Sequence, residues 1–203
     1  MLNKIAVKLA AEVLKGTGEG EEKKEVYVYG IELIISTGLL FATILMLSAL
    51  CNDFMMGVIF LSVFAPLRLF TGGYHADTYG KCYVISILLY GITMLLQSIL
   101  QPVIPARAII FLLLLMAVYI SLRAPVTHVN QPLSERRKQV NARVASVMVI
   151  VDLFYIWILS LYSLERMENA AFAMGLVAAL MLSADIKNSR KGETKHEDYC
   201  ENY

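Results

Sequence analysis

The chain has 203 residues, of which 58% are hydrophobic and only 17% are charged, and its formal net charge is +1. This composition excludes an ordinary soluble domain and predicts an all-α, polytopic membrane protein that forms one integral membrane domain in the lipid bilayer. It also argues against a nucleic-acid partner, which would require a basic face to neutralise phosphates.

The N-terminal segment has an amphipathic pattern. Apolar residues such as Ile5, Leu9 and Val13 recur at helical spacing, while lysines occupy the other side. The pattern predicts an interfacial helix over residues 1–15, although packing of that helix on the protein's own loops would need the same apolar stripe. Residues 16–30 are rich in Gly, Glu and Lys and are expected to form a charged linker.

Six apolar segments follow within residues 31–184, and residues 185–203 form a polar tail. Three of the segments are long enough to cross a bilayer, namely 33–50, 83–100 and 144–164. The other three, 54–67, 108–122 and 170–184, have 14 or 15 residues. They would cover about 21 to 23 Å as helices, against a hydrocarbon core of about 30 Å. They are therefore interpreted as either thin spans or re-entrant segments.

The placement of basic residues favours six crossings. If all six segments cross, 16 of the 18 lysines and arginines fall on one side, and only Arg107 and Arg166 fall on the other. Cytoplasmic loops carry the positive excess, so both termini and the loop between the second and third spans are expected in the cytoplasm.

That loop holds a histidine and a cysteine close together in the sequence. His75 and Cys82 are seven residues apart, which in one helix would separate them by about 10.5 Å along the axis, so a direct contact requires a break in the helix. Gly72 and Gly73 supply backbone freedom for a turn, and Asp77 can cap a helix that holds Cys82 in its first turns.

A cysteine in this position has the surroundings of a nucleophile. The positive end of the helix dipole and the adjacent Lys81 favour the thiolate form of Cys82, and His75 could transfer protons during peptide-bond cleavage. The same residues fit an ordinary buried cysteine beside a loop histidine. A metal site built from His75, Asp77, Cys82 and His128 is a weaker alternative because its spacing matches no zinc pattern, and we expect neither a metal nor another cofactor.

Two segments carry a resemblance to a known family. The pattern Arg68…Gly72-Gly73-Tyr74-His75 with Cys82, followed by the basic segment 123–138, resembles the accessory gene regulator B (AgrB) family over nearly the whole chain. The resemblance implies a membrane cysteine endopeptidase of Gram-positive bacteria with Cys82 and His75 as catalytic residues. It also implies an AgrD-like propeptide as substrate, whose C-terminal tail is removed through a Cys82 thioester before a substrate thiol closes a thiolactone ring for quorum sensing.

Other residues have secondary roles in this hypothesis. Arg68 and the basic cluster Arg136, Arg137 and Lys138 could bind the acidic tail of the propeptide, and Gly72 and Gly73 shape the loop or donate to an oxyanion. Asn130 is expected to order the second cytoplasmic loop near the site.

Three questions stay open at this stage. Asp152, a carboxylate inside a span, either orients His75 or hydrogen-bonds within the bundle. Small residues in segment 170–184 permit close packing within the chain or in a homodimer. A non-catalytic peptide exporter or assembly partner, in which Cys82 merely packs, is the alternative to the peptidase.

Overall fold

The computed structural model describes residues 2–17, 21–72, 79–101, 103–126 and 134–200. Within these ranges the backbone forms seven α-helices and a short 3-10 turn, with no β-strand. The elements are α1 (Leu2–Thr17), the turn Glu21–Lys23, α2 (Lys24–Leu50), α3 (Phe54–Thr71), α4 (Tyr79–Leu100), α5 (Ala106–Arg123), α6 (Glu135–Tyr162) and α7 (Leu164–Cys200). The six helices α2 to α7 are long and apolar enough to cross a membrane, so the prediction of an all-α, multi-pass membrane protein is confirmed.

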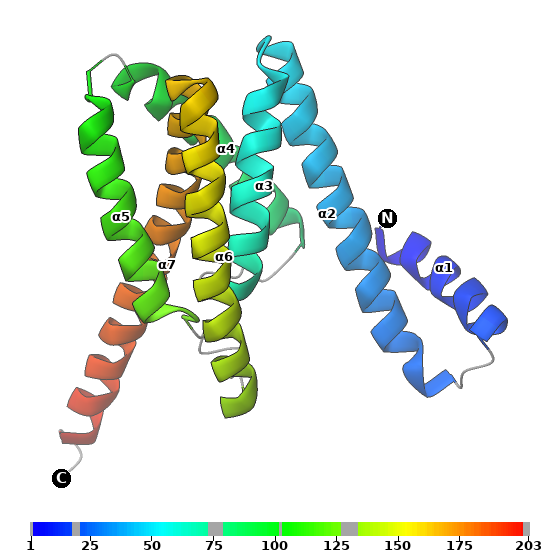
Figure 1. Ribbon diagram of the computed structural model, residues 1–203. Helices are drawn as coiled ribbons and strands as arrows, with labels where there is room; N and C mark the ends of the chain where they lie inside the picture. Colours follow the sequence, from blue (N-terminus) through cyan, green and yellow to red (C-terminus); the bar gives the residue numbers. More distant parts are fainter. Residues whose placement is uncertain (1, 18–20, 73–78, 102, 127–133, 201–203) are drawn as a thin grey trace.

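The three short apolar segments form complete helices. Segments 54–67 and 108–122 lie in α3 and α5, which have 18 residues each and therefore extend about 27 Å. The sixth lies in the apolar part of α7, Leu164–Ile186. Each helix continues past its apolar run to the ends of the bundle (Figure 1), which favours full spans over re-entrant segments.

Helices extend into the two segments that were expected as a charged linker and a polar tail. The charged linker expected over residues 16–30 is mostly helical, because α1 continues to Thr17 and α2 begins at Lys24. The Glu and Lys residues there are good helix formers, and the first turns of α2 contain apolar and aromatic residues that α1 can pack against. The expected tail after residue 184 continues α7 as a helix to Cys200, since no proline interrupts it.

The centre of the bundle is formed by α3 and α7. Half of the residues in the membrane-spanning part of each are buried, whereas at most 22% are buried in the other four spans. Small residues on α7, including Ala170, Ala173 and Ala178, are buried inside the chain and let the neighbouring helices approach closely. The small-residue pattern in the last segment therefore serves packing within the chain.

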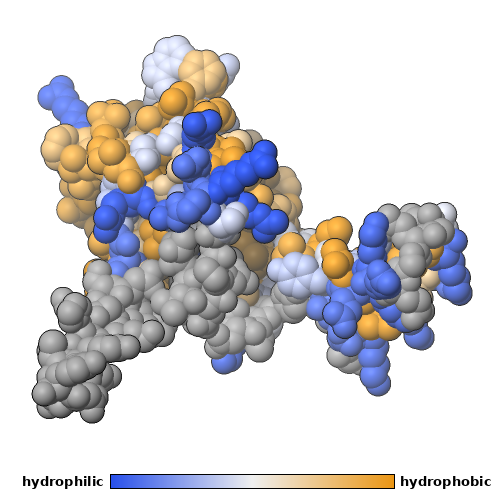
Figure 2. All heavy atoms as spheres, turned by 90° about the horizontal axis from the view of Figure 1, so that it is seen from below, coloured by the Kyte–Doolittle hydropathy of each residue, from blue (hydrophilic) through white to orange (hydrophobic). Residues whose placement is uncertain are grey.

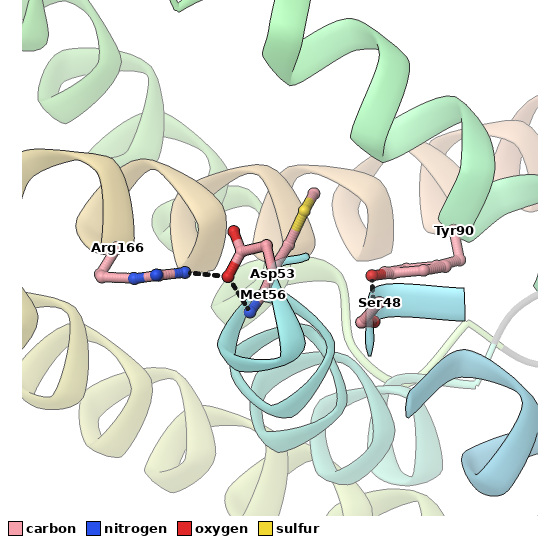
Figure 3. A network of polar contacts seen from close by, with 5 residues as sticks. All are labelled: Ser48, Asp53, Met56, Tyr90 and Arg166. Carbon is pink, nitrogen blue, oxygen red and sulfur yellow. Dashed lines mark hydrogen bonds and ion pairs between the residues drawn. The ribbon is translucent and has the colours of Figure 1, made fainter. Parts of the chain in front are cut away.

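At one end of the bundle, polar contacts join α2, α3, α4 and α7 (Figure 3). The Ser48 and Tyr90 hydroxyls share a hydrogen bond, and the Asp53 carboxylate caps α3 and pairs with Arg166. Gly57 lies directly against Ser48, because a β-carbon at residue 57 would be 2.1 Å from the Ser48 Oγ. These contacts fix the turn between α2 and α3.

The N-terminal helix packs on the first part of α2, apart from the other helices (Figure 1). One face of α1, containing Ala6, Ala10 and Leu14, is buried, and the Asn3 side chain donates a hydrogen bond of 2.9 Å to Glu32. A second apolar face, with Ile5, Leu9 and Val13 as exposed members, has no cover within the described residues. Because Glu32 immediately precedes the uncharged run of α2, α1 lies at the border of the apolar layer.

Candidate functional site

The candidate site lies at the opposite end of the bundle from the Asp53–Arg166 pair. There α3 and α5 end and α4 and α6 begin (Figure 1). Seen from this end, hydrophilic side chains gather beside a surface that is otherwise largely hydrophobic (Figure 2). The site is therefore a polar region at the edge of a membrane bundle.

Cys82 lies in the first turn of α4. It is exposed and free of a disulfide, which favours an accessible thiol over an ordinary buried cysteine. The helix break predicted between His75 and Cys82 agrees with the end of α3 at Thr71 and the start of α4 at Tyr79. An accessible sulfur at the start of a helix has the setting of a nucleophile.

Arg68 connects the end of α3 with the cysteine. Its guanidinium donates a hydrogen bond to the Gly72 carbonyl, and its positive charge interacts electrostatically with Cys82. Part of the donor capacity of Arg68 is thus used inside the chain, rather than being wholly free for the substrate as the sequence suggested. This arrangement holds a fixed cation beside the loop that leads to the thiol.

Gly72 joins the two loops of this end. Its φ is +69°, a region that residues other than glycine rarely adopt, and it forms a parallel β-bridge with Val126. The Val126 N–H donates to the Thr71 carbonyl at 2.9 Å. A β-carbon at residue 72 would lie 2.5 Å from the Val126 carbonyl oxygen, so only glycine fits this contact. The expected role of Gly72 in shaping the loop agrees with this geometry.

An ion pair that the sequence did not reveal fixes the end of α5, where the second cytoplasmic loop begins. The Arg123 Nε donates to the Asp185 carboxylate at 2.9 Å, which ties the end of α5 to α7. The two residues are 62 positions apart, and the only signal in the sequence is that each charge ends an apolar run on the same predicted side. This pair holds the backbone that leads to Val126.

The basic cluster Arg136, Arg137 and Lys138 lies in the first turn of α6, and all three residues are exposed. The Ser134 side chain caps this helix by accepting from the Arg137 N–H at 3.4 Å. Positive side chains at a helix N-terminus oppose the helix dipole, so helix stability does not explain the cluster. It leaves three cations available for an anionic partner or for the membrane surface.

Several predicted residues lie outside the described part of the chain. They are His75, Gly73, Asn130, Asp77 and His128. The approach of His75 to Cys82 therefore remains a prediction, and so does the effect of Asn130 on the second loop. Within the described residues, no group of three His, Cys, Asp or Glu side chains is placed so that it could hold a metal ion. Three of the four proposed ligands, however, lie outside the described residues.

Asp152 lies deep in the bundle, far from this end. It is 17 residues beyond Glu135, about 26 Å along α6, and its side chain is 6% exposed. Its Oδ2 has no hydrogen-bond partner among the described residues. This depth does not favour the role of a third catalytic group beside Cys82.

Comparisons with known proteins agree on one family. The family model described as accessory gene regulator B matches residues 2–184. A Clostridium perfringens protein named "Putative AgrB-like protein 2" is 24% identical over 166 residues, covering 79% of this chain and 78% of the relative. A "Putative AgrB-like protein" from another C. perfringens strain is 23% identical over 188 residues, covering 90% and 86% of the two chains. No solved structure matches the chain.

Proposed function

The chain belongs to the accessory gene regulator B family, which gives it a role in agr quorum sensing, and we propose that it acts there as a membrane-embedded cysteine endopeptidase. The observation that carries the proposal is the exposed thiol of Cys82 in the first turn of α4, on the side of the bundle where Arg68 lies in the last turn of α3. An accessible thiol at the positive end of a helix, near a fixed cation, is the setting in which a thiolate forms.

The proposed reaction has two steps. The Cys82 thiolate attacks the carbonyl carbon that joins the signal segment of an AgrD-like propeptide to its C-terminal tail. The C–N bond breaks, the tail leaves as an amine that takes a proton from His75, and the signal segment remains as a thioester on Cys82. A substrate cysteine thiolate then attacks this thioester, closes a thiolactone and releases the Cys82 thiolate. One thioester replaces another, so the second step is close to balanced in energy.

The surroundings of Cys82 support the binding of such a substrate. The cluster Arg136, Arg137 and Lys138 offers three exposed cations for an acidic tail. The joint between Gly72 and Val126 holds the loops after α3 and α5 together, so a peptide held by the second loop lies near the start of α4. The Gly73 backbone N–H is proposed as a donor to the oxyanion, while the Gly72 carbonyl is occupied by Arg68.

In the proposed orientation both termini and the Cys82 loop face the cytoplasm. Sixteen of the 18 lysines and arginines then lie on the cytoplasmic side, as the positive-inside rule requires. A propeptide made in the cytoplasm would meet the thiol without crossing the membrane. A homodimer in the membrane stays a prediction.

The decisive experiment compares three variants in membranes that contain the propeptide. Cys82→Ala and His75→Ala should each abolish cleavage, while Cys51→Ala, which removes a second exposed thiol at the far end of the bundle, should leave it intact. A hydroxylamine-sensitive adduct on wild-type Cys82, with the mass of the signal segment, should accumulate when the substrate cysteine is changed to serine. Normal processing by a correctly inserted Cys82→Ala variant would overturn the peptidase and favour an exporter or assembly partner.

A further inference from the structure

The first turns of α4 are attached to α2 by a tyrosine hydroxyl. Tyr83, which directly follows Cys82, shares a hydrogen bond of 2.8 Å with Thr43 Oγ1. Thr43 Oγ1 already donates its single proton to the Leu39 carbonyl at 2.9 Å, so the Tyr83 hydroxyl is the donor of the bond between the two helices. Leu39 and Thr43 both lie in the uncharged run of α2, where lipid offers no group that would compete for the Tyr83 proton.

A second bond of the same kind joins the two helices two turns further along α4. Ser48 Oγ donates to the Ile44 carbonyl at 2.7 Å, so the hydrogen bond between Ser48 and Tyr90 is donated by the Tyr90 hydroxyl (Figure 3). Tyr83 and Tyr90 are seven residues apart and therefore lie on one face of α4. Each tyrosine thus fixes its own part of that face against α2.

The orientation of the Cys82 side chain depends on the first of these bonds. Gly80, Lys81 and Cys82 are exposed, and burial on α4 begins with Tyr83, which is partly buried. The thiol is therefore one residue away from a side chain that is anchored on α2. Tyr90 is eight residues from Cys82, or about 12 Å along the helix, and acts on a different part of α4.

The attached face of α4 also determines where the thiol points. Successive residues of a helix are turned by about 100°, so the Cys82 side chain leaves α4 roughly a quarter turn away from Tyr83. Cys82 and Thr93 are eleven residues apart, or about three turns, and lie on the same side of the helix. Thr93 borders a hollow whose other walls belong to α5 and α7. With Tyr83 held on α2, the thiol therefore faces the α5 side of the bundle, where Gly72 and Val126 join the ends of α3 and α5.

We propose that Tyr83 is a positioning residue for the reaction at Cys82, an inference that rests on the proposed peptidase function. Its bond to Thr43 holds the start of α4 in the rotation that directs the thiol toward the joined ends of α3 and α5, where the proposed function places the substrate. Tyr83 takes no part in bond breaking. Without the bond the substrate still binds, but the sulfur meets the carbonyl less often in the orientation that attack requires, so kcat falls while affinity does not.

The kinetics of propeptide cleavage in membranes test this role. Tyr83→Phe and Thr43→Val each remove one hydroxyl of the bond, and each should lower kcat about fivefold while KM stays within about twofold of the wild-type value. Thr43→Ser keeps the acceptor and should keep most of the wild-type rate. The double variant Tyr83→Phe/Thr43→Val should be no slower than either single variant, because both changes act on one bond.

Tyr90→Phe is the matched control. It removes a hydrogen bond of the same kind between the same two helices, but eight residues away from the thiol. It should lower the Tm in detergent and leave kcat near the wild-type value. The Tm of every variant is measured in the same way, so that a loss of rate can be compared with any loss of stability.

A spectroscopic measurement separates this inference from the peptidase itself. Nitroxide labels are attached to Cys82 and to Val140→Cys on an exposed part of α6, in a chain whose other cysteines are serine. The distance distribution between the two labels is measured by double electron–electron resonance in detergent. It should be narrow when Tyr83 is present, broader in Tyr83→Phe, and unchanged in Tyr90→Phe.

The combined results distinguish the two proposals. Broadening in Tyr83→Phe without any cleavage by the wild type would contradict the peptidase but support Tyr83 as the residue that orients Cys82. Wild-type cleavage together with an unchanged kcat and unchanged distances in Tyr83→Phe would overturn the positioning role. A loss of kcat in Tyr83→Phe but not in Thr43→Val would also overturn it, because the phenol would then act directly on the substrate. Equal losses of kcat in Tyr83→Phe and Tyr90→Phe would reduce the bond to general packing.

Discussion

Gly72 and Val126 lie so close together that a β-carbon on residue 72 would be 2.5 Å from the Val126 carbonyl oxygen. The contact joins the chain that leaves α3 to the chain that leaves α5. It therefore fixes the ends of α3 and α5 relative to each other, on the side of the bundle where α4 begins with Cys82 in its first turn.

Replacement of Gly72 by alanine should reduce propeptide cleavage more than tenfold. The positive φ alone costs a non-glycine residue about 1 to 2 kcal/mol, and 1.4 kcal/mol corresponds to a factor of ten. The measurement is the cleavage rate at equal protein levels in membranes. Gly91→Ala is the matched control, because nothing lies within 4 Å of a β-carbon there. Equal cleavage rates for the two variants would show that the contact between Gly72 and Val126 is not needed for activity.

Loss of the Arg68 charge should slow alkylation of Cys82. A unit charge near a surface anion contributes about 1 kcal/mol, which corresponds to about a fivefold change in the rate at which a negatively charged sulfur reacts. In a chain whose other cysteines are serine, Arg68→Met should lower the rate of reaction with iodoacetamide about fivefold, and Arg68→Lys should restore part of it. Arg107→Met, at the other end of the bundle, should have no effect, and an unchanged rate in Arg68→Met would contradict the electrostatic role.

The basic first turn of α6 should act on substrate binding. Changing Arg136, Arg137 and Lys138 to glutamine should raise KM for a propeptide with an acidic tail at nearly constant kcat, and should have little effect when the tail is neutral. The same change removes unfavourable interactions with the helix dipole, each worth about 0.3 to 1 kcal/mol. Because the variant should therefore be no less stable than the wild type, unfolding cannot account for the higher KM. A fall in kcat with both substrates would point to another role.

The approach of α3 to α2 should not tolerate a methyl group at Gly57. A β-carbon there would be 2.1 Å from the Ser48 Oγ and would disturb the hydrogen bond between Ser48 and Tyr90. Overpacking of this kind costs about 1 to 3 kcal/mol, so Gly57→Ala should lower the Tm in detergent by several degrees. Gly38→Ala on the exposed side of α2 should keep the wild-type Tm or raise it slightly, and a similar Tm for both variants would argue against tight packing.

The two exposed cysteines test the orientation, because they lie at opposite ends of the bundle. In single-cysteine chains, a membrane-impermeant maleimide should label Cys51 in intact cells and Cys82 only after the membrane is opened. The reverse pattern would place the candidate site outside the cell, where a newly made propeptide could not reach it.

Hydropathy and charge alone predicted six spans and the position of Cys82 near the start of a helix, but α2 begins at Lys24 and α6 at Glu135, well before the predicted apolar runs 33–50 and 144–164. These features are local: a long uncharged run needs a helix in lipid, and a glycine pair followed by polar residues interrupts one. Helix extends into the segments expected as a linker and a polar tail, because polar residues continue a helix when their neighbours are good helix formers.

Tertiary structure decided which helices are central and what surrounds the thiol. Apolar residues face both lipid and core in a membrane protein, so hydropathy could not distinguish the half-buried α3 and α7 from the lipid-facing α5. Nor could it show that Arg68 turns back to the Gly72 carbonyl or that Arg123 pairs with Asp185. These contacts join residues whose proximity depends on how separate helices pack, and packing depends on shape rather than on polarity.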